Sequence, residues 1–118
     1  MRATDLRIGN YIGCDGDILI VEKIDSKNNI GFSLFKKAVG QHVNSGNKYY
    51  IELTEEILLN KTPFQKINDA HYAYLSFMIW RVENRFYYDK NGTELKYIHD
   101  LQNSFYYNTN KVELTINL

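Results

Sequence analysis

The spacing of apolar residues changes twice between residues 93 and 116, in the segment TELKYIHDLQNSFYYNTNKVELTI. Ile98, Leu101, Phe105 and Asn108 follow one another at intervals of three or four residues, which places them on one face of a helix. Residues 112–116 then alternate between apolar and polar, as in a strand with one buried face. The pattern therefore predicts a helix whose apolar stripe packs on a sheet, followed by a C-terminal strand.

Three short stretches near the N-terminus predict a β-meander. The first strand is expected from Leu6 to Ile12, and Asp15 with Gly16 supplies the turn that follows it. Residues 18–24 (ILIVEKI) are rich in β-branched side chains, and residues 30–35 (IGFSLF) form a third short run. Small SH3-like barrels begin with strands of this kind, and so do many other β modules.

Two segments connect the meander to the rest of the chain. Residues 36–48 (KKAVGQHVNSGNK) contain two glycines and little periodicity, which is typical of a loop. Such a loop is either a functional segment or a tolerated surface insertion. Thr54 is the expected N-cap of a short helix, and Glu55 and Glu56 in its first turn favour the helix dipole. Pro63 ends this helix.

The most apolar run of the chain, residues 72–82 (YAYLSFMIWRV), predicts a central strand. Both of its alternating sets of side chains are apolar, so we expect both faces of this strand to be covered. Residues 85–89 (RFYYD) return beside it. Asn91 with Gly92 then supplies the strongest hairpin turn signal in the chain. A further strand is expected from Leu95 to Tyr97.

Together these elements predict an α+β fold. It consists of an N-terminal β-meander, a short helix, and an antiparallel sheet with one packed helix and a C-terminal strand. With 118 residues, the chain has the length of one domain, so residues 1–118 are expected to form a single domain.

Charge and cysteine content restrict the partners and the cellular compartment that we expect for this chain. Fourteen basic residues balance fourteen acidic ones, so no overall field draws the chain onto nucleic acid. The one cysteine, Cys14, excludes an internal disulfide and fits a reducing compartment. No apolar run approaches the length of about 18 residues that a membrane-spanning helix needs. We therefore expect a cytoplasmic protein without membrane contact.

The residues that common catalytic and metal sites require are scattered along the chain. The glycines form no phosphate-binding fingerprint. Cys14 and the three histidines, His42, His71 and His99, lack the spacing of zinc ligands. His99 and Asp100 are neighbours on the predicted helix, so we expect them to point about 100° apart rather than to pair. We therefore expect neither an enzyme nor a bound metal or cofactor.

Ten tyrosines suggest that part of the surface binds a partner. Tyrosine offers a large, rigid contact at low entropy cost. Aromatic and arginine side chains also dominate the hot spots of protein interfaces. The candidate partner-binding residues lie on the return strand and on the flank of the helix, and they are Arg85, Tyr87, Asn103, Tyr106 and Tyr107.

The hairpin that contains two of these candidates has other interpretations. Phe86 and Tyr88 share one face of the return strand and Tyr87 takes the other, so only one set can be buried. A structural pair of strands therefore explains the aromatic residues. Alternatively, the basic and aromatic residues from Arg81 to Lys90 could hold single-stranded nucleic acid. The acidic residues among them dilute the positive charge.

Three motifs together resemble a family of short, uncharacterised proteins of Bacteroidetes-type bacteria, their phages and their mobile elements. The motifs are LRIGNY at residues 6–11, ELTEEILL at residues 52–59 and KYIHDLQNSFYYNTNKVEL at residues 96–114. Members of that family often end in a tyrosine–valine–histidine–x–leucine–glutamine–asparagine helix followed by a glutamate–leucine strand. Here residues 36–48 are longer than usual, and residues 108–111 replace a threonine–glycine turn.

The resemblance implies a setting, phage or mobile DNA, and no particular reaction. Small proteins from that setting often bind and block a host factor, including CRISPR effectors. Our leading hypothesis is a non-enzymatic accessory protein that binds and inhibits a host protein, with a CRISPR or other defence nuclease as the most specific version. The alternative is a small nucleic-acid-binding module that uses the N-terminal strands and the hairpin from Arg81 to Lys90.

Overall fold

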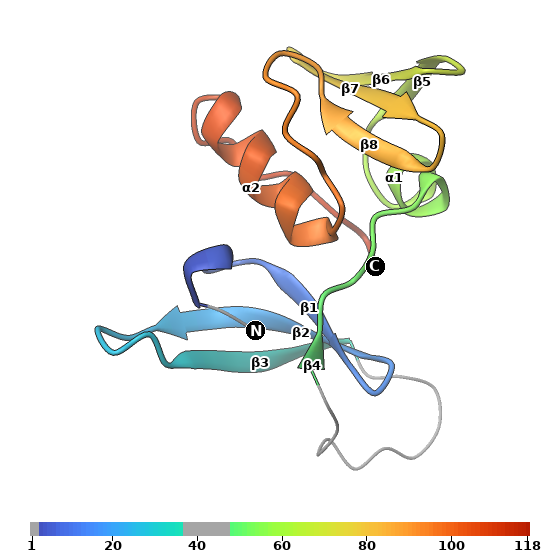
Figure 1. Ribbon diagram of the computed structural model, residues 1–118. Helices are drawn as coiled ribbons and strands as arrows, with labels where there is room; N and C mark the ends of the chain where they lie inside the picture. Colours follow the sequence, from blue (N-terminus) through green and yellow to red (C-terminus); the bar gives the residue numbers. More distant parts are fainter. Residues whose placement is uncertain (1–2, 37–47) are drawn as a thin grey trace. The chain divides into compact units, whose positions relative to one another are not determined.

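Antiparallel strands follow the period-two pattern in both halves of the chain. The computed structural model describes residues 3–36 and 48–118, and the chain divides into two units, Met1–Ile51 and Glu52–Leu118 (Figure 1). Each unit holds a four-stranded antiparallel sheet, and the helices α1 and α2 belong to the second unit. The predicted α+β class is therefore confirmed. The grouping of residues 1–118 into a single domain stays a prediction.

The first unit contains the predicted meander, and its strands are ordered β3-β2-β1-β4. The predicted start of the first strand at Leu6 is wrong, because residues 7–10 form a turn and β1 begins at Tyr11. In that turn Asn10 N–H donates to the Arg7 carbonyl at 3.0 Å, and Arg7 N–H donates to Asn10 Oδ1 at 2.6 Å. The elements are the 3-10 helix Ala3–Asp5, β1 (Tyr11–Cys14), β2 (Asp17–Ile24), β3 (Ile30–Lys36) and β4 (Lys48–Tyr49).

A small cluster of buried apolar side chains lies on one face of this sheet. Its members come from the segment before β1 and from the first two strands: Leu6, Ile12, Cys14, Leu19 and Val21. Residues 37–47, which make up almost all of the predicted loop, lie outside the part of the chain that the structure describes.

In the second unit, consecutive hairpins give a sheet ordered β5-β6-β7-β8. The helix predicted after Thr54 is confirmed, since Thr54 Oγ1 accepts a hydrogen bond from Ile57 N–H at 3.2 Å. The elements are α1 (Glu55–Asn60), β5 (Gln65–Asn68), β6 (His71–Tyr74), β7 (Phe77–Val82), β8 (Arg85–Tyr88) and α2 (Ile98–Asn108).

The single central strand predicted at residues 72–82 is wrong. The run is a hairpin, in which Tyr72 pairs with Ile79 and Tyr74 pairs with Phe77. The chain reverses at Leu75, whose φ of 55° is positive although it is not a glycine. Because the turn holds Leu75 and Ser76 and neither glycine, proline nor asparagine, the sequence pattern carried only the weak signal of one serine.

Helix α2 covers one face of the second sheet, as its apolar stripe predicts. Ile98, Leu101 and Phe105 are all fully buried. The Phe105 ring lies 5.5 Å from Phe77 and 5.8 Å from Tyr74, measured between ring centroids. The sheet therefore has a core face, on which α2 packs, and an opposite face.

The strand predicted at residues 112–116 is also wrong. Its burial does alternate, with Leu114 and Ile116 buried and Val112 exposed. However, in the described part of the chain this segment joins no sheet, and Asn117 N–H donates to the Lys61 carbonyl at 2.7 Å. Period-two burial requires only a core to pack on, whereas a strand also requires a ladder of backbone hydrogen bonds.

The strand expected from Leu95 to Tyr97 is likewise reduced to isolated pairs. Glu94 pairs with Tyr87 of β8, and Tyr97 pairs with Glu52 before α1. The segment between them therefore touches the chain on both sides without forming a continuous ladder.

The packing of α2 predicts the effect of shortening its buried side chains. Leu101→Ala or Phe105→Ala should lower the free energy of unfolding by about 2–5 kcal/mol, because each leaves a cavity in the core. Chemical denaturation measures this loss. Tyr107→Ala on the same helix, where the side chain is 67% exposed, is the matched control and should cost less than about 1 kcal/mol. A loss below about 0.5 kcal/mol for both core variants would contradict the observed docking.

Candidate functional site

Three large apolar side chains project from the face of β7 that α2 does not cover. Along this strand Phe77 and Ile79 are buried, whereas Met78, Trp80 and Val82 are 38%, 45% and 41% exposed. Successive side chains of a strand point to opposite faces, so these three form one stripe. The predicted burial of both faces of this strand is therefore wrong.

Strand β8 adds two predicted candidates to this stripe. Cα partners in an antiparallel pair share a face, and Tyr87 pairs with Trp80 while Arg85 pairs with Val82. The Trp80 and Tyr87 rings lie 6.5 Å apart between centroids. Phe86 and Tyr88 are buried on the core face, so the predicted division of the return strand is confirmed. We call the surface formed by Met78, Trp80, Val82, Arg85 and Tyr87 the open face.

The centre of the open face holds no Asp, Glu, Lys or Arg, and His71 of β6 shares this face as the partner of Trp80. A hydrogen bond with Tyr87 and the nearby charge of Glu94 raise the pKa of Arg85, which therefore keeps its positive charge. Arg85 and Glu94 lie at one margin, and the stripe on β7 holds no ionisable group. Aromatic residues, Met and Arg without central charge are the composition that distinguishes the cores of protein interfaces.

The candidates on α2 lie on a different side of the unit. Asn103 and Tyr106 are half-buried, and Tyr107 is well exposed, with its ring 5.3 Å from that of Tyr106. Because α2 packs on the core face, these residues cannot join Arg85 and Tyr87 in one surface. The five predicted residues therefore fall into two groups.

Arg81 points away from the open face and is engaged in the structure. Its Nη1 lies 2.5 Å from Glu55 Oε2 and 3.2 Å from the Tyr72 hydroxyl, and its Nε donates to the Glu83 carbonyl at 2.7 Å. It pairs in register with Phe86, a residue of the core face. The hairpin therefore does not present Arg81 and Arg85 together, which weakens its interpretation as a nucleic-acid site.

Glu55 anchors the start of α1 to the sheet. Its carboxylate accepts hydrogen bonds from the Tyr72 hydroxyl and from Arg81, and it lies 3.4 Å from Lys66 Nζ. The hydrogen bond from Tyr72 is the main cause that lowers the pKa of Glu55, and the two cations act in the same direction. Burial and the Glu55 hydrogen bond raise the pKa of Tyr72. These contacts hold α1 against the sheet, so we interpret the cluster as structural.

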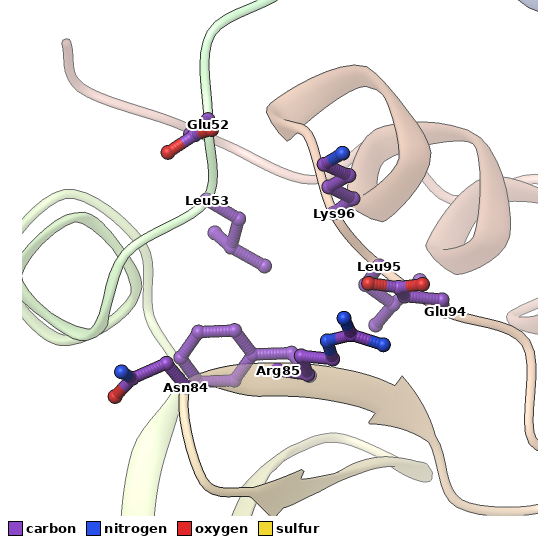
Figure 2. A pocket seen from close by; sticks show the side chains of 8 residues that line it. Glu52, Leu53, Asn84, Arg85, Glu94, Leu95 and Lys96 are labelled. Carbon is purple, nitrogen blue, oxygen red and sulfur yellow. The ribbon is translucent and has the colours of Figure 1, made fainter.

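A pocket of about 210 Å³ lies where the chain before α1 and the chain before α2 meet the start of β8 (Figure 2). Leu53, Phe86 and Leu95 are buried and form its floor. Its remaining lining residues are exposed and mostly charged: Glu52, Asn84, Arg85, Glu94 and Lys96. A second cavity of about 240 Å³ shares Glu52, Leu53, Asn84 and Phe86 with it and continues toward Thr54, Glu55 and Arg81. We call the first cavity the wedge pocket.

The side chains of His99 and Asp100 lie closer together than the sequence predicted. His99 is buried, and its Nε2 lies 3.4 Å from Asp100 Oδ1, so the two neighbours do approach each other. Asp100 also caps α2, because its Oδ2 accepts from Tyr97 N–H at 2.9 Å. Within residues 3–36 and 48–118, no group of three or more His, Cys, Asp or Glu side chains could hold a metal ion.

No protein-family model, no curated protein and no solved structure matches this chain. Among the helices that the structure describes, none is both long enough and apolar enough to cross a membrane.

Sequence reasoning missed Met78, Trp80 and Val82 as surface residues. They were assigned to a strand covered on both faces, because an apolar run cannot by itself distinguish a buried face from a binding face. A turn at Leu75 would have divided the run into two strands, but Ser76 alone is a weak turn signal.

The cluster around Glu55 predicts a pH-dependent contribution to stability. The pKa of Glu55 is lowered in the folded chain, so its contribution is complete above the ordinary glutamate pKa of about 4.3 and is lost as the pH falls through the folded value. Glu55→Gln should therefore destabilise the protein at pH 7, and the difference from the native chain should shrink on acidification. Denaturation at a series of pH values measures both.

The neighbouring variant Glu56→Gln is the control, because Glu56 lies in the same helical turn and outside this cluster. It should change stability much less than Glu55→Gln at pH 7. Equal effects of the two variants would contradict the structural role of the cluster.

Proposed function

We propose that this chain is a non-enzymatic accessory protein of a phage or mobile element that binds and inhibits a host protein. The observation that carries the proposal is the open face. It presents a tryptophan, a methionine, a tyrosine and an arginine, which are the residue types enriched in interface cores and hot spots.

The open face suits a protein partner of particular chemistry. The stripe of Met78, Trp80 and Val82 would be covered by an apolar surface of the partner. Arg85 at the margin would meet a carboxylate, with which a guanidinium forms strong paired hydrogen bonds. A polyanion fits less well, because Arg81 is held on the opposite face and Glu94 lies near Arg85.

The setting comes from the three motifs at residues 6–11, 52–59 and 96–114, which resemble proteins of phages and mobile elements. A defence nuclease, such as a CRISPR effector, is the host protein that we propose. Inhibition by contact would be stoichiometric, since the inhibitor occupies a surface and is not turned over.

Substitutions on the two candidate surfaces test which one binds. Trp80→Ala and Tyr87→Ala should leave the fold intact and should weaken binding of the partner by about 1–4 kcal/mol each, as hot-spot truncation does. Tyr107→Ala is the matched control on α2 and should change binding by less than about 0.5 kcal/mol. The partner is first captured from the host with the native chain, and affinities are then measured by calorimetry with the purified protein.

The opposite ranking would move the interface to α2. If Tyr107→Ala or Tyr106→Ala abolished binding while Trp80→Ala did not, the open face would not be the binding surface. Circular dichroism of each variant separates loss of contact from loss of fold.

Titration of the purified partner nuclease tests the inhibitory part of the proposal. Cleavage should fall in proportion to added protein and reach its minimum near an equimolar ratio. Complete inhibition by a small fraction of one equivalent would indicate catalytic action and would contradict a non-enzymatic inhibitor.

Salt-dependent binding tests the nucleic-acid alternative. Because the open face offers one guanidinium, we expect no tight binding to single-stranded DNA or RNA in fluorescence anisotropy at low or moderate salt. Micromolar binding that weakens steeply with salt and disappears in Arg85→Ala would instead favour a nucleic-acid module.

A further inference from the structure

The wedge pocket begins where the pairing of β8 with the next segment stops. Leu95 N–H donates to the Phe86 carbonyl at 2.7 Å, and Tyr88 N–H donates to the Thr93 carbonyl at 2.8 Å. In a regular antiparallel pair, Phe86 N–H would donate in return to the Leu95 carbonyl. Among the residues that the structure describes, that hydrogen bond is not formed. A donor and an acceptor of the backbone therefore face the gap.

Both of these backbone groups belong to buried residues. Phe86 is 4% exposed and Leu95 is fully buried. The N–H and the carbonyl of one strand residue point to the same edge of the strand. The Phe86 carbonyl points toward Leu95, so Phe86 N–H also points away from β7 and cannot bond to it. Buried backbone groups are paired in nearly all proteins, with protein, water or a ligand, so this pair offers a donor and an acceptor to a molecule that enters the pocket.

The rim of the pocket supplies charges of both signs. Arg85 and Lys96 are cationic and Glu52 and Glu94 are anionic, and in the described part of the chain none of the four joins an ion pair. Figure 2 shows Arg85 and Glu94 next to each other, with Leu53 across the pocket from them. A ligand with a single charge would meet a repelling group as well as an attracting one.

We infer that the wedge pocket binds a free α-amino acid with an apolar side chain. The carboxylate of the ligand accepts from Phe86 N–H and from the side chains of Arg85 and Lys96. Its ammonium group donates to the Leu95 carbonyl and faces Glu94. Its side chain lies on Leu53 and the Phe86 ring.

The volume and the mixed charge favour this class of ligand over others. The wedge pocket of about 210 Å³ adjoins the second cavity of about 240 Å³, and together they lie at the lower end of the 300–1,000 Å³ or so of pockets for drug-sized molecules, which favours a small ligand. An inorganic anion would leave the apolar floor and Glu94 without partners. An apolar molecule without charge would leave the Phe86 N–H and Leu95 carbonyl unsatisfied.

Titration of the ¹⁵N-labelled protein with leucine tests the inference, with the Phe86 amide resonance as the direct readout. Leucine should shift this resonance in a saturable manner, with a dissociation constant on the order of 1 mM or below. Three analogues each remove one feature: N-acetyl-leucine lacks the ammonium, leucinamide lacks the carboxylate and glycine lacks the side chain. Each should bind about tenfold more weakly or worse.

Two variants locate the site. Lys96→Ala should weaken leucine binding several-fold, since it removes a charge that contacts the carboxylate. Lys90→Ala is the matched control, because Lys90 is an exposed lysine in the turn after β8 and does not line the pocket. It should leave the titration unchanged.

Three results would overturn the inference. The first is a Phe86 amide that does not respond to leucine up to about 20 mM, well beyond the expected range. The second is equal binding of N-acetyl-leucine, which would assign the pocket to the C-terminus of a peptide rather than to a free amino acid. The third is equal weakening by Lys96→Ala and Lys90→Ala, which would reduce the effect to overall charge.

Discussion

The packing of Phe105 against the aromatic face of the second sheet is the interaction on which that unit depends. Its ring contacts Phe64, Tyr74 and Phe77, which come from the segment before β5, from β6 and from β7. One side chain of α2 therefore holds together two strands and the connection that leads into them. The sheet could not otherwise bury these rings, because consecutive hairpins alone leave both of its faces in water.

Covering one face with a helix has a direct consequence for the other. The chain contains one long helix in its second unit, and α2 is committed to the core face. Met78, Trp80 and Val82 therefore remain exposed, although apolar side chains of this size are usually buried. Contiguous exposed apolar residues on soluble proteins mark interaction surfaces more often than single ones do. The open face is thus the side of the sheet that no second layer of this unit covers, and a bound partner would supply that layer.

Sequence reasoning succeeded where local spacing alone determines the structure. The period of Ile98, Leu101 and Phe105 identified the buried side of α2, and the cap at Thr54 identified the start of α1. It failed where the structure depends on contacts between residues that are distant in the sequence. The chain turns at Leu75 and Ser76 without glycine, proline or asparagine, and the pairing of Tyr74 with Phe77 on either side holds the positive φ of Leu75.

The C-terminal segment also shows that local spacing does not determine which backbone groups pair. Leu114 and Ile116 alternate as a strand would, and they are buried as predicted. Nevertheless no ladder forms there within the described residues, because alternation reports a nearby core and gives no information about backbone partners. The same distinction between local spacing and distant contacts applies to the candidate binding residues. Tyr87 was placed correctly by alternation, whereas the exposure of Trp80 required knowledge of which face α2 covers.

Arg85 connects the two surfaces discussed for this unit. Its backbone lies opposite Val82 on the open face, and its side chain lines the wedge pocket beside Glu94. A guanidinium that binds a ligand carboxylate is less available to a carboxylate of a protein partner, since both compete for the same donors. Occupation of the pocket and binding at the open face would therefore oppose each other, and by linkage the reduction in affinity would be the same in both directions. Under both proposals, the pocket and the open face would share one cation and would therefore be coupled rather than independent.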